Sequence, residues 1–196
     1  MKGSTFFDIS LSEKDYALLK QIKIYFGVGS ISFYEKTKSC KFRVSSIKDI
    51  NLIINNFRNF PLITQKRANF LIFQEIFNII QRGEHLTKEG LYKIITLKAS
   101  MNLGLTEKLQ SEFKNIKPVE RPLVVDENIQ DPHWLAGFTS AEGCFLIAIQ
   151  HGKTLTGYTV NLVFKLAQHS RDEQLLKSFI KYLVPSPPGP PPRMKL

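Results

Sequence analysis

One nine-residue stretch decides how this chain folds. It reads Leu135-Ala136-Gly137-Phe138-Thr139-Ser140-Ala141-Glu142-Gly143. The small residues Gly137 and Ala141 are one helical turn apart, so a helix here can bring its backbone close to a second helix. Glu142 closes the helix, where the partial negative charge of a helix C-terminus disfavours a carboxylate by roughly a few tenths of a kcal/mol. Because a carboxylate is unfavourable at this position, we expect Glu142 to bind a ligand, and a metal ion is the candidate.

The composition describes a basic chain with enough apolar residues for a packed core. Of its 196 residues, 43% are hydrophobic and 11% aromatic, and the formal net charge is +10. A surplus of this size predicts a polyanionic partner, either nucleic acid or an anionic membrane surface. Cys40 and Cys144 lie far apart, so neither a disulfide framework nor a cysteine metal site is expected. No apolar run approaches the roughly 20 residues of a membrane span, and the first residues resemble neither a signal nor a transit peptide.

Hydrophobic periodicity and capping signals predict an α+β protein. The expected strands cover residues 7–11, 30–34, 41–45, 144–150 and 156–168. The expected helices cover residues 13–26, 47–57, 64–82, 87–102, 106–113, 132–142 and 171–183. Residues 114–131 contain two prolines and little periodicity, which predicts a linker. Residues 185–196 are rich in proline, which excludes a helix or a central strand and favours an extended or disordered tail.

An internal repeat relates the two ends of the chain. At a constant offset of 157 positions, the set Phe7, Ile9, Asp15, Leu18, Leu19, Lys20, Tyr25 matches the set Phe164, Leu166, Asp172, Leu175, Leu176, Lys177, Tyr182. Each copy is expected to be a strand that leads into a helix, which indicates an internal duplication. The same offset would place the partner of the 135–143 motif before Met1, so we expect both repeats to be incomplete and the chain to be truncated at both ends.

Residues 134–145 resemble the signature of the LAGLIDADG homing endonucleases, and in particular the linked single-chain members found in fungal mitochondrial introns. Residues 59–66, 101–105 and 157–169 also look like recurring segments of that family. The resemblance implies two pseudo-symmetric αββαββα repeats, whose motif helices pack together and whose saddle-shaped antiparallel sheets lie over DNA. The expected domains are a first repeat over 1–113 without its motif helix and first strand, a linker over 114–131, a second repeat over 132–184 and a tail over 185–196.

The resemblance also implies a site. In the family, the acid at the end of each motif helix binds a divalent metal, expected here to be Mg²⁺, beside the phosphates that are cut. Glu142 occupies this position, so the resemblance implies that it is a catalytic and metal-binding residue. Gly137 and Ala141 match the small residues at the helix interface, and Lys66 lies in a segment that approaches the cleavage region and could assist as a cation. Cutting both strands calls for two such acids, and this chain supplies one.

Strand alternation predicts the DNA contacts, since one face of each strand packs on helices and the other is free. In the second repeat we expect Phe145, Ile147 and Ile149 to point inward. The expected DNA contacts are Ser30, Ser32, Tyr34, Lys41, Arg43, Ser45, Gln150, Thr159, Asn161 and Lys165. Asp8, Ser10, Leu146, Ala148 and Val163 are expected on the same outward faces. Arg43 can read guanine, and Asn161 or Gln150 can read adenine.

Three functions stay open from the sequence. The first is a site-specific double-strand DNA endonuclease with impaired activity, acting as a monomer in mitochondria and without a membrane partner. The second is a maturase-like splicing cofactor that binds intron RNA, or another non-catalytic nucleic-acid-binding remnant, and needs no Glu142 carboxylate. The third is a decayed reading frame without function, which the proline-rich tail favours.

Overall fold

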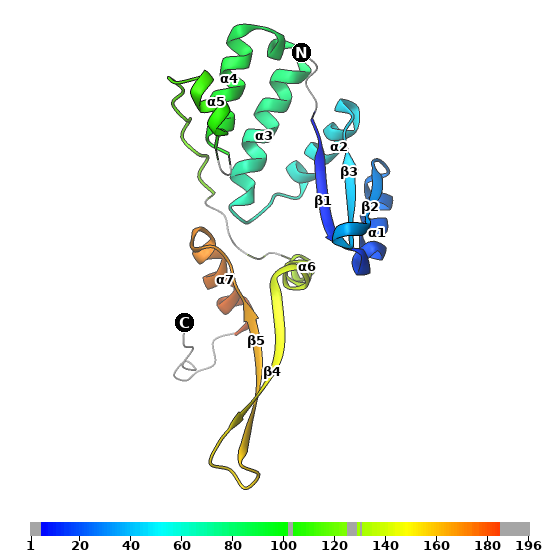
Figure 1. Ribbon diagram of the computed structural model, residues 1–196, viewed down its shortest axis with the longest axis vertical. Helices are drawn as coiled ribbons and strands as arrows, with labels where there is room; N and C mark the ends of the chain where they lie inside the picture. Colours follow the sequence, from blue (N-terminus) through cyan, green and yellow to red (C-terminus); the bar gives the residue numbers. More distant parts are fainter. Residues whose placement is uncertain (1–4, 102–103, 125–128, 130, 185–196) are drawn as a thin grey trace. The chain divides into compact units, whose positions relative to one another are not determined.

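The computed structural model describes residues 5–101, 104–124, 129 and 131–184. The chain forms two compact units (Figure 1). Unit 1 comprises Met1–Leu62 and Lys66–Leu123, and unit 2 comprises Ile63–Gln65 and Val124–Leu196. The predicted proline-rich tail over 185–196 lies outside the described residues, and the predicted domain bounds stay a prediction. Within the described part, no helix is long and apolar enough to cross a membrane.

Unit 1 is built around a three-stranded antiparallel sheet. Its strands are β1 (Phe7–Ser12), β2 (Ser30–Tyr34) and β3 (Ser39–Val44), in the order β1-β3-β2. The register pairs Ile9 with Phe42 and Phe42 with Ile31, so the apolar residues of all three strands share one face. The helices α1 (Tyr16–Phe26) and α2 (Ile47–Asn59) pack with this sheet.

The core of unit 1 follows from this alternation. Its fully buried members are Leu19, Cys40, Phe42, Val44, Ile50, Ile53, Ile54 and Phe77, which come from α1, β3, α2 and α3 (Lys66–Gln81). Ser46 caps α2, because its hydroxyl accepts the Asp49 amide N–H at 3.0 Å. The other helices of unit 1 are α4 (Lys88–Ala99) and the short α5 (Glu107–Glu112), and a second apolar cluster joins Ile72 and Ile79 to Leu97.

Unit 2 consists of two helices and a long hairpin. The helix α6 (Pro132–Glu142) leads directly into β4 (Gly143–His151), which pairs antiparallel with β5 (Tyr158–Leu166), and α7 (Glu173–Leu183) follows. In Figure 1, α6 and α7 lie at the end of the hairpin where β4 begins, and its turn extends beyond both helices. Among the described residues of this unit, the buried apolar ones are Val124 and, in α7, Leu175 and Phe179.

The internal repeat has the same local structure in both copies. A 3₁₀ turn over Glu13–Asp15 precedes α1, and a 3₁₀ turn over Ser170–Asp172 precedes α7. The turns and the helices of the two copies therefore begin and end 157 residues apart, which is the offset of the repeat. Even the cap is repeated, since the Ser12 hydroxyl accepts the Lys14 amide N–H and His169 Nδ1 accepts the Arg171 amide N–H. The predicted duplication is thus present as a strand–turn–helix unit in the fold.

Candidate nucleic-acid interface and acidic site

The helix α6 carries the sequence motif and begins as the sequence predicts. Asp131 is its N-cap, with a carboxylate oxygen 2.7 Å from the His133 amide nitrogen, and Pro132 has the first helical position. The helix ends at Glu142, where the Gly143 amide donates to the Thr139 carbonyl. Glu142 is therefore the last helical residue, and the strand β4 begins with the next residue.

Gly143 makes this abrupt junction possible. Its backbone is extended, with φ −80° and ψ 149°, so the glycine is not needed for a left-handed conformation. A Cβ atom at this position would lie 2.5 Å from the Thr139 carbonyl oxygen and 2.8 Å from Thr139 Cγ2. Only glycine lets the chain leave the helix this close to its last turn, which holds Glu142 at the point where helix and strand meet.

One side of α6 is packed by aromatic rings. The ring centroids of Trp134 and Phe138 are 4.9 Å apart, and those of Phe138 and Phe179 are 5.3 Å apart. Phe179 belongs to α7, so these rings join the two helices of unit 2. Aromatic pairs at such distances contribute about 0.5–1.5 kcal/mol each beyond the area that they bury.

The other side of α6 is open. Gly137, Ser140, Ala141 and Glu142 are all exposed, and a Cβ built on Gly137 would meet nothing within 4 Å. The packing inside unit 2 therefore does not require these small residues. A face of small residues that is free of contacts is the surface that a second helix can approach closely.

The Glu142 carboxylate is available for a ligand. It is exposed, and within the described part of the chain no hydrogen bond or ion pair engages it. The described residues contain no group of three or more His, Cys, Asp or Glu side chains that could hold a metal by themselves. Mg²⁺ is commonly held by one or two carboxylates together with waters and substrate phosphates. A single exposed carboxylate therefore fits a metal that is shared with a bound phosphate backbone.

The open face of the unit 1 sheet is polar and carries cations. Across the strands, Asp8 pairs with Arg43 and Arg43 with Ser30, while Ser10 pairs with Lys41 and Lys41 with Ser32. Tyr34 lies on the same face, and its ring is 5.1 Å from Lys41 Nζ. The register thus brings five of the six contact residues predicted in unit 1 onto one face. Ser45, the sixth, is exposed and follows the end of β3.

Asp8 and Arg43 form the strongest charged contact on this face. Arg43 Nε and Nη2 donate to the two carboxylate oxygens of Asp8 at 2.7 and 2.6 Å. The hydrogen bonds to Arg43 hold the pKa of the Asp8 carboxyl below its usual 3.8, against the smaller opposing effect of burial. The same bonds raise the pKa of Arg43. Both groups therefore stay charged throughout the physiological pH range.

The hairpin of unit 2 presents a comparable face. Gln150 pairs with Thr159, Ala148 with Asn161 and Cys144 with Lys165. Directly opposite residues share one face of an antiparallel sheet. The four contact residues predicted in unit 2 therefore lie together on this face, which begins two residues after Glu142.

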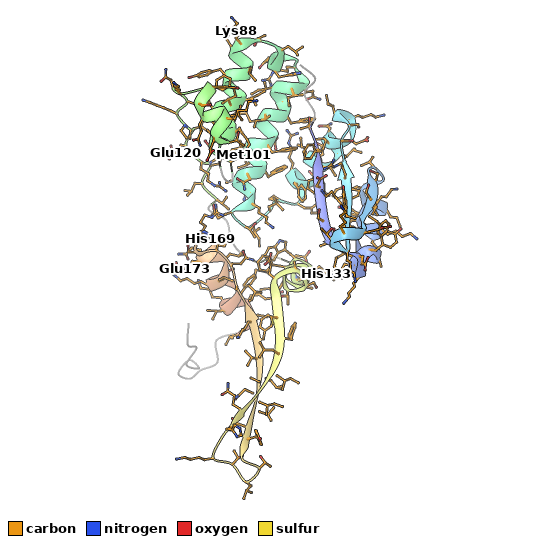
Figure 2. The ribbon with its side chains drawn as sticks, viewed as in Figure 1. Lys88, Met101, Glu120, His133, His169 and Glu173 are labelled. Carbon is orange, nitrogen blue, oxygen red and sulfur yellow. The ribbon has the colours of Figure 1, made fainter. Side chains whose placement is uncertain are left out.

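The opposite face of the hairpin corrects one expectation. Phe145, Ile147 and Ile149 do lie on the face opposite to Gln150, but their exposed fractions are 77%, 67% and 65%. Their cross-strand partners Phe164, Leu162 and Val160 are exposed as well. The expectation of inward burial was wrong, because no described element covers this face along the hairpin. The turn end of the hairpin also extends beyond α6 and α7 (Figure 2). Alternation assigns the face but not its burial.

Lys66 is the first residue of α3 and is exposed. A cation is disfavoured in the first turn of a helix, which has partial positive charge. Its position is thus as unusual for a lysine as that of Glu142 is for an acid.

Sequence reasoning missed the contacts between neighbouring side chains. The Asp8–Arg43 ion pair, the Phe6 ring 4.7 Å from the Arg43 guanidinium and the capping role of His169 were not expected. Asp8 and Arg43 are 35 residues apart, and only the β1–β3 register brings them together. The signal that could have found the pair is a lone acid on an otherwise basic strand face.

Two sheets that each have one polar face, in a chain of net charge +10, fit a protein that binds nucleic acid. The LAGLIDADG endonuclease family profile matches residues 2–77 and 135–186. This chain belongs to the LAGLIDADG endonuclease family, whose homing members are DNA-cleaving hydrolases and are metal-dependent in general.

The curated relatives are encoded in introns. The chain is 39% identical over 178 residues to "Probable intron-encoded endonuclease 3" of Neurospora crassa. The aligned region covers 90% of this chain and 33% of that protein. It is also 39% identical over 189 residues to "Probable intron-encoded endonuclease 2" of the same organism, with 90% and 40% covered. The chain thus spans well under half the length of these two relatives.

Solved structures agree with the fold. The I-LtrWI homing endonuclease bound to target DNA matches with a TM-score of 0.88 and 39% identity, covering 92% of this chain and 61% of that one. I-SmaMI, bound to uncleaved DNA in the presence of calcium ions, matches with a TM-score of 0.87 and 37% identity, covering 92% and 62%. The expected α+β fold with antiparallel sheets is confirmed.

Proposed function

We propose that this chain is part of a site-specific endonuclease that cuts double-stranded DNA, with Glu142 as its catalytic residue and metal ligand. The observation that carries the proposal is the junction at the end of α6. There an unpaired carboxylate lies directly before a hairpin whose one face groups Gln150, Thr159, Asn161 and Lys165. An acid beside a polar surface of this kind brings a metal ligand close to the bound phosphate backbone.

The DNA interface comprises the open faces of the two sheets. The residues proposed to contact DNA are Ser30, Ser32, Tyr34, Lys41, Arg43, Ser45, Gln150, Thr159, Asn161 and Lys165. Lysine and arginine on these faces neutralise phosphates and give affinity, while serine, threonine, asparagine and glutamine donate and accept at base edges. The net charge of +10 agrees with a polyanionic partner.

The proposed metal is Mg²⁺, held by the Glu142 carboxylate together with phosphate oxygens of the substrate. Bound there, such an ion would activate water and neutralise charge on the phosphate. The Glu142 carboxylate would lie at the edge of the interface, because the chain leaves the helix at Gly143, immediately after it. Lys66 is proposed as an assisting cation, and Gly137 and Ala141 as the surface for a second helix.

The wider setting is proposed from the relatives. The relatives are named as encoded in introns, and two of them lie in introns of ND4 and cox1 genes. From these genes we propose a mitochondrial origin for this chain. We also propose that the protein acts as a monomer.

The test compares DNA cleavage by the purified wild-type chain and by the Glu142→Gln variant. A plasmid library with a randomised insert is incubated with Mg²⁺, and conversion of supercoiled DNA to nicked or linear forms is measured. The wild type is expected to cut in Mg²⁺ and not in EDTA, and Glu142→Gln is expected to lose at least about a hundredfold in rate because it removes a metal ligand. Binding of a DNA duplex should be unchanged in the variant.

The matched control is Glu112→Gln, which removes an exposed acid from α5. Cleavage at the wild-type rate by Glu142→Gln would refute the catalytic role. Binding of both proteins to intron RNA in preference to DNA would favour the splicing cofactor instead.

A further inference from the structure

Arg43 is held in one orientation by its neighbours on the unit 1 sheet. Asp8 accepts from Nε and Nη2 at 2.7 and 2.6 Å, and the Phe6 ring centroid lies 4.7 Å from the guanidinium carbon. An exposed arginine normally loses side-chain rotamer entropy when it binds a ligand. Here Asp8 on β1 and Phe6, the residue before β1, restrict the Arg43 guanidinium before any ligand binds.

The geometry leaves one end of the guanidinium free. Arginine has five N–H donors in a planar fork, and Asp8 takes one from Nε and one from Nη2. The second N–H of Nη2 and its neighbour on Nη1 remain as a parallel pair at the end of the group. Within the described residues, no hydrogen bond or ion pair engages Nη1. The free pair matches two adjacent acceptors, and in the major groove only guanine presents these, as O6 and N7.

Asp8 has a cost that general DNA affinity cannot explain. A carboxylate on a DNA-facing sheet repels phosphates, so removing it would strengthen non-specific binding. Its charge is partly offset by Lys41, whose Nζ lies 4.0 Å away, but the acid remains on the open face. Orientation of Arg43 is a role that does use the carboxylate, because side-on contact with Asp8 leaves the end-on pair for a base.

We propose that Arg43 reads one guanine of the target and that Asp8 and Phe6 are positioning residues that hold its guanidinium end-on to that base. The proposal rests on the proposed function, since it takes the open sheet face as the DNA interface. The internal repeat adds an asymmetry. The position that matches Asp8 in unit 2 is Lys165, opposite Cys144, so the two sheets differ in charge at equivalent positions.

The test selects binding sites from a randomised double-stranded DNA library, in Ca²⁺, with wild type and variants. Arg43→Ala is expected to lose the preference for guanine at one base pair, by about 5- to 150-fold, and to keep the preferences elsewhere. Asp8→Asn should lower the same preference while non-specific affinity stays equal or rises, and Asp8→Glu should restore part of it. Phe6→Ala should give a smaller loss at the same base pair.

A 7-deazaguanine duplex makes the readout specific to one atom. Replacing N7 at that base pair removes one of the two acceptors, so wild-type affinity should fall and Arg43→Ala affinity should not. The control is Lys23→Ala, which removes an exposed cation from α1 and should leave the base preferences unchanged. Circular dichroism verifies that each variant is folded.

Three outcomes would overturn the proposal. If Arg43→Ala weakens binding to all sequences equally and lowers the salt slope by about one, Arg43 contacts a phosphate. If Asp8→Asn leaves the guanine preference intact, Asp8 does not position Arg43. If the wild type enriches no sequence at all, the DNA interface itself fails, and this result separates the failure of the proposed function from the failure of the inference.

Discussion

At the scale of single residues, Glu142 and Gly143 act as a pair. Helix electrostatics disfavour the acid at the C-terminus, and the glycine is required by the Thr139 carbonyl rather than by its own dihedral angles. Together they place a carboxylate at the last possible helical position, with its chain turning away behind it. The residue types were readable from the sequence, but the steric reason for Gly143 was not.

Gly143→Ala tests this junction. The added Cβ overlaps the Thr139 carbonyl, a backbone atom that has little room to move, so we expect a loss of about 1–3 kcal/mol in the free energy of unfolding of unit 2. Urea unfolding followed by the fluorescence of Trp134, the single tryptophan, measures it. Gly157→Ala is not a suitable control because Gly157 has a positive φ, whereas Gly137→Ala places a methyl group in open space. An equal or smaller loss in Gly143→Ala than in Gly137→Ala would contradict the steric argument.

At the scale of elements, α6 has two different faces. Its aromatic side is joined to α7 through Phe179, and its small-residue side is free. The sequence motif predicted the small residues, because Gly137 and Ala141 have helical spacing. The aromatic contact between α6 and α7 could not be predicted, since it joins residues more than forty positions apart that no local pattern relates.

Phe179→Ala tests that contact. Phe179 is 6% exposed and touches both Trp134 and Phe138, so its truncation should cost about 3–5 kcal/mol and release α6 from α7. A red shift of Trp134 fluorescence under native conditions measures the release. Phe145→Ala removes the same side chain from an exposed position of the same unit and should leave the spectrum unchanged. Equal effects of the two substitutions would refute the assigned packing.

At the scale of the whole molecule, one strand–turn–helix repeat occurs in two different surroundings. In unit 1, β1 is joined by β3 and β2, and this unit holds nearly all of the fully buried side chains. In unit 2, β5 pairs only with β4 among the described strands. Of the residues of this unit that the structure describes, Leu175 is the one fully buried large side chain. Identical local patterns thus lead to very different amounts of core.

Hydrogen exchange should detect this difference. Two-stranded sheets are marginally stable in water unless helices cover them, so the amides of β4 and β5 should exchange much faster than those of β3. The expected difference is at least about tenfold, because local opening scales with the buried apolar contacts of a segment. Mass spectrometry of peptides from both units measures it, and the amides of α1 and α7 provide a comparison at matched repeat positions. Equal protection of the two sheets would show that the hairpin is covered in solution.

The sequence by itself determined the family, the order of the elements, the repeat and the face on which each strand residue lies. These follow from local periodicity and spacing, which the backbone geometry of helices and strands imposes over a few residues. Tertiary structure alone decided which side chains meet, as for Asp8 with Arg43 and Trp134 with Phe179. It also decided which apolar face is covered, as with the exposed face of Phe145, Ile147 and Ile149. The physical reason is that burial and pairing depend on elements distant in the chain, and no local pattern records where those elements pack.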